Sequence, residues 1–154
     1  MKRFFFIFIF ILFNCTNEKN KIEYHQNLDL IWDIENVNWN GTSLIMSEGN
    51  IYGHTLSDSI FKLDFKSGKI IWKKYLRGTY SNEIPKVQKE KIFFSGAENL
   101  IALNKNGKLL WSENTNTKTV GLTLNDSIIL NTRTSEGLFA NSIKSGKEVW
   151  NIKP

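Results

Sequence analysis

A short motif that returns at a fixed interval constrains this chain more than any other feature. The pattern Gly-Lys-x-x-Trp occurs at Gly68 to Trp72, at Gly107 to Trp111 and at Gly146 to Trp150. Its glycines and its tryptophans are each 39 residues apart (107 − 68 and 146 − 107; 111 − 72 and 150 − 111). An earlier tryptophan, Trp32, precedes Trp72 by 40 residues (72 − 32) and lacks the Gly-Lys pair. A constant period in this range is the signature of a repeat architecture.

The residues between the motifs have the pattern of short β-strands. Runs rich in β-branched and aromatic side chains alternate with turn residues, and no run has helical periodicity. The expected strands are 43–46, 51–52, 60–63 and 70–72 in the first unit, 85–87, 91–94, 100–103 and 109–111 in the second, and 120–124, 127–130, 138–140 and 149–152 in the third. Four short antiparallel strands per repeat are typical of a β-propeller blade. The sequence therefore predicts an all-β fold of antiparallel four-stranded blades.

Each motif is expected to have a mechanical role in its blade. The glycine would lie in the turn between the third and fourth strands, where glycine adopts a positive φ without steric cost. Asp64, Asn104 and Ser142 could hydrogen-bond the backbone of these turns. The tryptophan would project from the outer strand toward the neighbouring blade, and its burial would contribute at most about 5 kcal/mol per junction. We therefore interpret the tryptophans as core residues and not as a ligand platform.

The motif resembles the tryptophan-docking motif of PQQ-like (pyrroloquinoline-quinone-type) propeller repeats. Residues 62–72 match it best, although Lys62 replaces the usual alanine; residues 140–150 have Ser142 in place of the aspartate, and residues 102–111 are one residue short in the turn. The structural docking residues implied by the resemblance are Asp64, Gly68, Trp72, Asn104, Gly107, Trp111, Gly146 and Trp150. WD40 repeats have a similar period, but only Trp32-Asp33 supplies a Trp-Asp pair, and no Gly-His pair precedes it.

The number of units is low for a propeller, which usually closes with four to eight blades. We expect a PQQ-like propeller segment over residues 27–154, with repeats at about 41–78, 79–115 and 116–154. A leading outer strand around 29–34 would precede the three blades. We therefore expect either a fragment of a larger propeller or a protomer that closes by self-association through its open blade ends.

The first residues have the pattern of an export signal. Lys2 and Arg3 are followed by an apolar run of ten residues, 4–13, which is shorter than the roughly 20 residues needed to span a membrane. Residues 1–14 are therefore predicted to be a signal peptide.

Cys15 follows the apolar run directly and is the only cysteine of the chain. Leu12 to Cys15 resembles the lipobox of bacterial lipoproteins, although Phe13 is bulkier than usual and Asn14 replaces the usual small residue. The resemblance implies that Cys15 is lipidated, that residues 15–26 form a polar tether, and that the protein is anchored at the outer membrane or the periplasmic face of the cell envelope. A plain signal peptide that leaves Cys15 incidental is the alternative.

Composition and the motif search argue against several classes of function. The formal net charge of +5 falls to +3 (18 basic and 15 acidic side chains) once Lys2 and Arg3 are removed, which is too small an excess to indicate nucleic acid. Neither His25 nor His54 belongs to a metal-binding pattern, and no P-loop, dinucleotide or nucleophile-elbow motif occurs. We therefore predict no catalytic residue, metal or cofactor, and we do not expect an enzyme.

A lipoprotein with PQQ-like repeats resembles the BamB family, the propeller subunit of the outer-membrane barrel-assembly machinery. This resemblance implies a binding scaffold with a protein partner in the envelope. Quinoprotein dehydrogenases with the same repeats hold PQQ and calcium through an acidic cluster, often with a vicinal cysteine pair, and this chain has no Cys-Cys pair. The alternative is a fragment of a larger PQQ-like propeller, an enzyme or a ligand sensor, without independent activity.

Overall fold

The computed structural model of the chain describes residues 31–33, 43–80 and 83–154. The strands in these residues are β1 (Leu44–Ser47), β2 (Asn50–His54), β3 (Ser59–Asp64), β4 (Ile70–Tyr75), β5 (Lys86–Gln88), β6 (Lys91–Ser95), β7 (Asn99–Asn104), β8 (Leu109–Asn114), β9 (Thr119–Leu124), β10 (Ile128–Arg133), β11 (Gly137–Ser142) and β12 (Glu148–Ile152). None of the described segments is a helix long and apolar enough to cross a membrane. The predicted signal peptide (1–14), Cys15 and the tether (15–26) lie outside the described residues.

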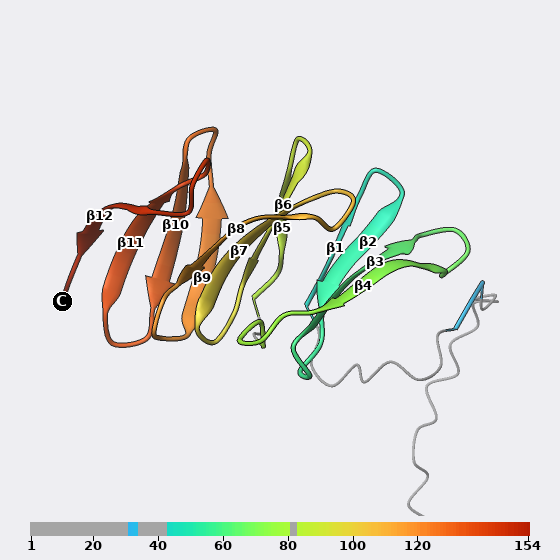
Figure 1. The fold of residues 1–154 in the computed structure, drawn as a ribbon, viewed down its shortest axis with the longest axis horizontal. Helices are drawn as coiled ribbons and strands as arrows, with labels where there is room; N and C mark the ends of the chain where they lie inside the picture. The colour runs from blue at the N-terminus through green and yellow to red at the C-terminus, as the bar shows by residue number, and fades with distance from the viewer. Residues whose placement is uncertain (1–30, 34–42, 81–82) are drawn as a thin grey trace, which may run out of the picture.

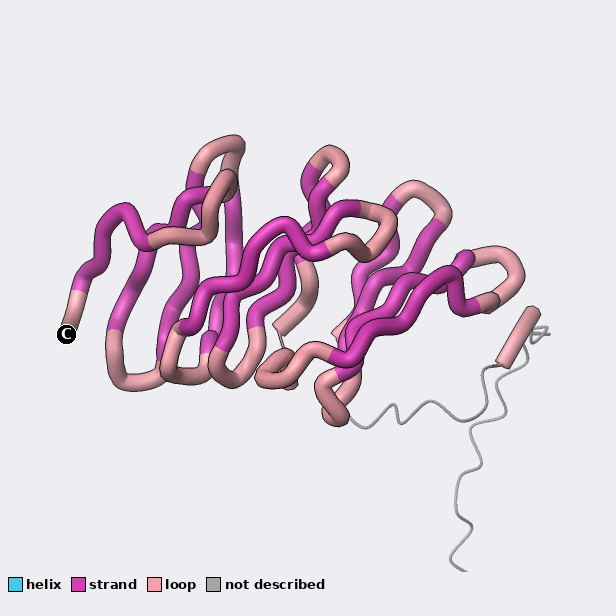
Figure 2. The backbone as a smooth tube through the Cα atoms, viewed as in Figure 1, coloured by secondary structure: helices cyan, strands magenta, loops and turns pink. Residues whose placement is uncertain are grey.

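The strands form three antiparallel four-stranded sheets, which we call blades 1, 2 and 3. Blade 1 contains β1 to β4, blade 2 contains β5 to β8, and blade 3 contains β9 to β12, each in sequential order. The blades lie side by side in chain order, and the carboxyl terminus follows β12 at one end of the row (Figures 1 and 2). Contacts between β1 and β5 and between β5 and β9 join the inner edges of successive blades. The predicted all-β fold of propeller blades is confirmed.

Each blade has a β-bulge one residue before its motif tryptophan. In blade 1, Trp72 pairs with Lys62 whereas Ile70 pairs with Leu63, so that Ile71 is the extra residue. The register shifts at the equivalent point between β7 and β8 and between β11 and β12. Side chains alternate between the two faces of a regular strand, so Ile70 and Trp72 would share a face without the bulge. The bulge places Trp72 on the opposite face, toward the next blade.

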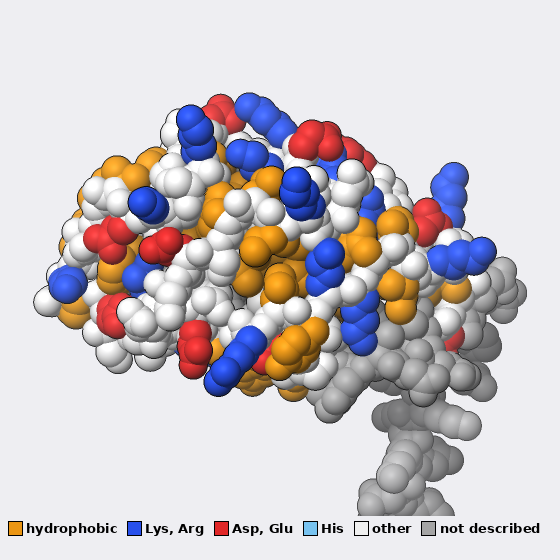
Figure 3. All heavy atoms as spheres, in the orientation of Figure 1, with side chains coloured by type: hydrophobic (Ala, Val, Ile, Leu, Met, Phe, Trp, Pro, Cys, Tyr) orange, Lys and Arg blue, Asp and Glu red, His pale blue; other side chains and the backbone are white. Residues whose placement is uncertain are grey.

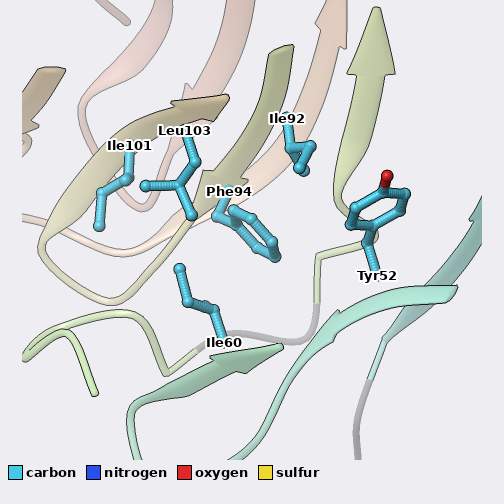
Figure 4. Close-up of a cluster of buried hydrophobic side chains, with 6 residues drawn as sticks. All are labelled: Tyr52, Ile60, Ile92, Phe94, Ile101 and Leu103. Atoms are coloured by element: carbon cyan, nitrogen blue, oxygen red, sulfur yellow. The ribbon is translucent and has the colours of Figure 1, made fainter. Parts of the chain in front are cut away.

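The core consists of apolar layers between neighbouring blades. Between blades 1 and 2 the buried layer comprises Tyr52, Ile60, Ile92, Phe94, Ile101 and Leu103 (Figure 4). Between blades 2 and 3 it comprises Phe93, Leu100, Ala102, Leu122 and Ile129. Removal of this apolar area from water is the main force that holds one blade on the next.

Only part of the expected leading strand around 29–34 is described. Residues 31–33 form no strand, and the remainder of that range lies outside the described residues. Trp32 nevertheless contacts blade 1 through its side chain.

Candidate functional site

The motif tryptophans of blades 1 and 2 dock on the turn of the following blade. The indole N–H of Trp72 donates to the carbonyl oxygen of Lys105 at 3.1 Å, and that of Trp111 donates to the carbonyl oxygen of Ile143 at 3.2 Å. Both acceptors lie in the turn before the fourth strand of the next blade. Each indole therefore joins two blades by apolar contact and by one hydrogen bond.

The motif glycines make room for these indoles. A Cβ atom on Gly107 would lie 2.9 Å from Cδ2 of Trp72, and one on Gly146 would lie 2.5 Å from Cε3 of Trp111. Both glycines also have a positive φ, 78° and 76°. Glycine is thus needed at these positions both for the turn conformation and for the close approach of the ring.

The polar residues of the motif stabilise the same turns. Asp64 accepts hydrogen bonds from the backbone N–H and the hydroxyl of Ser67, which lower the pKa of the Asp64 carboxyl. The Asn104 side chain accepts from the backbone N–H groups of Asn106 and Lys108. Five of the eight predicted docking residues lie at the junctions between blades: Trp72, Asn104, Gly107, Trp111 and Gly146. Asp64 and Gly68 lie in the turn of blade 1, and Trp150 lies on β12 of blade 3.

A further docking contact, which the sequence analysis did not assign, involves Trp32. Its indole N–H donates to the carbonyl oxygen of Phe65 at 2.8 Å. A Cβ atom on Gly68 would lie 2.6 Å from Cδ2 of the Trp32 ring, so the ring needs a glycine at this position. The Gly68 turn of blade 1 is therefore occupied in the same way as the turns of blades 2 and 3. The 40-residue spacing from Trp72 was the available signal, but the missing Gly-Lys pair obscured it.

Trp150 is the motif tryptophan that has no docking turn among the described residues. It lies on β12, at the flank of blade 3 that faces away from blade 2, and it is 42% exposed. Beside it, a hollow of about 320 Å³ is lined by Gly121, Leu122, Thr123, Leu130, Thr132 and Leu138. We call this side of blade 3 the open flank.

A lysine in the turn of blade 2 connects it to blade 1. The ammonium group of Lys105 contacts the carboxylates of Glu48, in the β1–β2 turn, and of Glu90, in the β5–β6 turn. The hydrogen bond with Glu48 is the main cause of a raised pKa of Lys105. The backbone carbonyl of the same residue accepts the Trp72 indole, so one residue supports the junction twice.

His54 is buried at the end of β2. Its Nε2 lies 2.8 Å from the carbonyl oxygen of Glu83, and its ring meets the ring of Phe94 edge to face. Its Nδ1 has no hydrogen-bond partner in the described part of the chain. Burial lowers the pKa of His54. The arrangement suits a neutral imidazole that packs at the junction of blades 1 and 2.

The outer strands carry apolar side chains that remain exposed. Five of them, from 43% to 56% exposed, occupy the two positions before the motif tryptophans: Ile70, Ile71, Leu109, Leu110 and Val149. We call these five residues the outer-strand surface. The strands that bear them, β4, β8 and β12, are the edge strands of their sheets. On the face shown in Figure 3, hydrophobic side chains gather among separate lysine and arginine side chains.

The described residues bring together no group of three or more His, Cys, Asp or Glu side chains that could hold a metal ion. The carboxylates of the β2–β3, β6–β7 and β10–β11 turns, Asp58, Glu98 and Glu136, belong to separate blades. Asp58 accepts a hydrogen bond from the backbone N–H of Tyr80 and so supports the segment that leads to blade 2.

Comparison with solved structures gives the same architecture. The computationally designed Ika4 protein matches with a TM-score of 0.67 at 12% identity, over 80% of this chain and 79% of that chain. BamB from Moraxella catarrhalis matches with a TM-score of 0.57 at 20% identity, over 72% of this chain and 34% of that chain. Quinohemoprotein alcohol dehydrogenase from Comamonas testosteroni matches with a TM-score of 0.57 at 20% identity, over 72% of this chain and 20% of that chain. This chain thus spans about a third of that BamB and a fifth of that dehydrogenase.

No curated protein matches the chain. The family profile described as outer membrane protein assembly factor BamB matches residues 27–153, which include all three blades and Trp32. The chain therefore belongs to the BamB-like family of PQQ-type β-propeller repeat proteins.

Proposed function

We propose that this protein is an exported, lipid-anchored propeller scaffold of the bacterial cell envelope that binds β-barrel proteins during outer-membrane assembly. The observation that carries the proposal is the outer-strand surface, where exposed apolar side chains lie on strands at the edges of the described sheets. Membership of the family of the outer membrane protein assembly factor BamB supports the assembly role. We propose binding, without catalysis, as the activity.

An extended strand is the kind of partner that such a surface suits. An edge strand offers backbone N–H and C=O groups to an added strand, and neighbouring apolar side chains contact alternate side chains of the partner. On β4, the apolar Ile70 and Ile71 are followed by Lys73 and Lys74. Lysine on an edge strand discourages pairing between copies of this chain. Acidic side chains on a partner strand would offset this, because opposite charges on paired strands stabilise the pair. Segments of an outer-membrane barrel have alternating apolar and polar residues, which suit pairing in an extended conformation.

Lipid attachment would hold this surface at the membrane. The lipobox-like segment Leu12 to Cys15 supports the attachment, since acyl chains on one residue give stable anchoring. Metabolic labelling with a radioactive fatty acid tests it: the proposal expects a labelled protein, and loss of the label in Cys15→Ala. An unlabelled wild-type protein would contradict the anchor and leave the partner surface to be tested separately.

Site-specific photo-crosslinking in the living cell tests the partner. A photoreactive amino acid at Ile71 or Leu110 is expected to crosslink an outer-membrane β-barrel precursor. The matched control is Asn125, which is exposed in the turn between β9 and β10, away from the outer strands. Equal crosslinking from Asn125, or no envelope protein captured from Ile71 and Leu110, would contradict the proposed surface.

A second candidate function is a role as part of a larger PQQ-like propeller that binds a small ligand. It is favoured by the fold shared with a quinohemoprotein alcohol dehydrogenase, of which the chain spans 20%. Incubation with pyrroloquinoline quinone and calcium, followed by gel filtration, distinguishes the two candidates. The scaffold proposal expects a colourless protein, and retained visible absorbance would favour the second candidate.

A further inference from the structure

We propose that the docking turns form part of a basic rim that binds the phosphate headgroups of an anionic membrane surface. The surface involved is one end of the blades, where the turns of all three sheets come together. Its binding requires neither the assembly role nor lipid attachment at Cys15.

The turns of the three blades divide between two rims. Successive strands of a blade are antiparallel, so the turns after its first and third strands lie at one end of the sheet. The turn after its second strand and the link to the next blade lie at the other end. We call the first end the docking rim, which comprises residues 48–49, 65–69, 89–90, 105–108, 125–127 and 143–147. The second end is the opposite rim, which comprises residues 55–58, 76–80, 83–85, 96–98, 115–118 and 134–136.

Hydrogen bonds connect the turns within each rim. In the docking rim, the backbone N–H of Lys105 donates to the carbonyl oxygen of Glu90. In the opposite rim, the backbone N–H of Glu98 donates to the carbonyl oxygen of Gly78. The β1–β2, β5–β6 and β9–β10 turns of the docking rim lie at the top of Figure 1, and the β2–β3 and β10–β11 turns of the opposite rim lie at the bottom. The two rims are therefore separate surfaces.

The two rims carry net charges of opposite sign. The docking rim has seven basic and three acidic side chains, a net charge of +4 (7 − 3). The opposite rim has two basic and four acidic side chains, a net charge of −2 (2 − 4). Asp64 and Lys91, at strand ends beside the docking rim, offset each other. Such a separation of charge orients a protein at a charged surface, with the docking rim toward the negative charges.

The three acidic side chains of the docking rim are already engaged by two of its lysines. Lys105 contacts Glu48 and Glu90, and Lys89 lies 3.7 Å from Asp126. The remaining lysines of the docking rim are exposed and form no ion pair in the described part of the chain: Lys66, Lys69, Lys108, Lys144 and Lys147. Each docking turn therefore keeps at least one positive charge that the protein does not neutralise.

The lysine of the Gly-Lys-x-x-Trp motif takes no part in docking. The glycine and the tryptophan of the motif form the blade junctions. The side chains of Lys69, Lys108 and Lys147 are exposed, and none of them forms a hydrogen bond with a described residue. The motif therefore places a free ammonium group at the same corner of each blade.

The composition of the docking rim suits a lipid surface better than a protein. All seven of its basic residues are lysines, whereas protein interfaces are depleted in lysine and enriched in arginine. The lysine ammonium is a point charge on a flexible stem, which suits headgroups that offer no fixed geometry. Phe65, beside Lys66, is 43% exposed and adds an apolar side chain to the charged contact. Membrane-surface binding combines these two contributions.

Partitioning between vesicles tests this binding. The full chain carries Cys15→Ala, so that no acyl chain contributes, and it is mixed with vesicles of phosphatidylcholine alone or with added phosphatidylglycerol. The protein is expected to bind the anionic vesicles more tightly and to lose this preference as salt is added. Residues 1–14 are common to every variant, so differences between variants report on the rims.

The rim variant combines Lys66→Gln with Lys144→Gln. Each lysine near an anionic membrane surface strengthens binding by roughly five-fold, so the double variant should bind the anionic vesicles roughly 25-fold more weakly. The matched control combines Arg77→Gln with Lys118→Gln, which removes the same charge from the opposite rim. It should change binding by less than about two-fold, because the attraction falls off within a Debye length. Circular dichroism checks that both variants retain their strands.

Hydrogen exchange measured by mass spectrometry on the same vesicles gives the orientation. Residues 65–69, 105–108 and 143–147 should exchange more slowly on anionic than on neutral vesicles, whereas residues 55–58, 96–98 and 134–136 should not. Equal losses of binding in the two double variants would overturn the assignment, because net charge alone would then explain it. So would docking turns that anionic vesicles leave unprotected. Binding of soluble polyglutamate without a preference for phosphatidylglycerol would assign the rim to an acidic protein and would also overturn it.

Discussion

The two ends of the row of blades present the two complementary halves of a blade junction, and they differ in whether that half is covered. At the blade 1 end, the Gly68 turn is covered by Trp32, and Phe61 and Leu63 are buried. At the blade 3 end, Trp150 is 42% exposed and Ile152 on the same strand is 60% exposed. The blades have the same strand order and the same bulge, so the difference lies in what each flank contacts.

This contrast shows that a blade is defined by its neighbours as much as by its own strands. Each junction requires an indole from one side and a glycine turn from the other, and neither half buries its apolar surface alone. A residue of identical type, such as Trp111 or Trp150, should therefore have very different energetic importance according to the junction that it occupies.

The largest expected effect is the difference between two tryptophan truncations. Trp111→Ala removes an indole that packs beside Phe93, with ring centroids 6.0 Å apart, and that donates a hydrogen bond to blade 3. It should lower the free energy of unfolding by about 3 kcal/mol, whereas Trp150→Ala should lower it by less than about 1 kcal/mol in the monomer. Urea unfolding followed by circular dichroism measures the free energy of unfolding of both variants. Equal losses in this free energy would contradict the difference between the closed junction and the open flank.

A smaller effect is expected from a methyl group at a docking turn. Gly146→Ala forces a side chain into the left-handed region at a φ of 76° and places Cβ 2.5 Å from the Trp111 ring. Strain and overpacking together should cost about 2 kcal/mol. Gly49→Ala is the matched control, because Gly49 has a φ of 71° and no heavy atom within 4 Å of the added Cβ, so only the strain of about 1 kcal/mol applies. Thermal unfolding of both variants gives the difference, and an equal cost would argue against close indole packing.

The smallest expected effect is a pH dependence confined to one junction. Because burial lowers the pKa of His54, the unfolded chain binds a proton more readily than the folded one. The contribution of neutral His54 to the free energy of unfolding is therefore fully present at a pH above 6.5, the ordinary pKa of histidine, and is lost as the pH falls below that value. The register equivalent in blade 3 is Thr132, which does not titrate.

Hydrogen exchange at pH 7.5 and pH 5.5 measures this dependence segment by segment. Protection of β2 and β6 should fall at the lower pH, whereas that of β10 and β11 should change less. The His54→Thr variant carries at this position the residue type found at the equivalent position of blade 3. It should abolish the difference in protection between the two pH values. A uniform loss of protection in all three blades would indicate that another group is responsible.

The sequence predicted the repeated parts of the fold well, because they depend on local chemistry. Glycine-cornered turns, β-branched runs and a constant period were enough to place the strands of each blade and the docking motif. The β-bulge was not predicted, although it explains the motif: two residues separate Lys69 from Trp72 because one of them, Ile71, is the extra residue that turns the indole toward the next blade.

The parts that the sequence did not reveal depend on contacts between distant residues. Lys105 joins Glu48 and Glu90, which precede it by 57 and 15 residues, and nothing local distinguishes it from the other lysines. Trp32 lacks the Gly-Lys pair of the motif, so its spacing from Trp72 alone does not reveal the turn on which it docks. The half-buried Trp72 and the exposed Trp150 belong to the same motif. Their exposure differs because a described blade follows the first and not the second.

Hydrogen exchange of the indole N–H groups, observed by nuclear magnetic resonance at a concentration where the chain is monomeric, tests the central claim most directly. The indole protons of Trp72 and Trp111 should exchange slowly, because each is bonded to the backbone of the next blade, whereas that of Trp150 should exchange at the rate of a solvated indole. Rapid exchange at Trp72 and Trp111, equal to that at Trp150, would contradict the docking of each blade on the next.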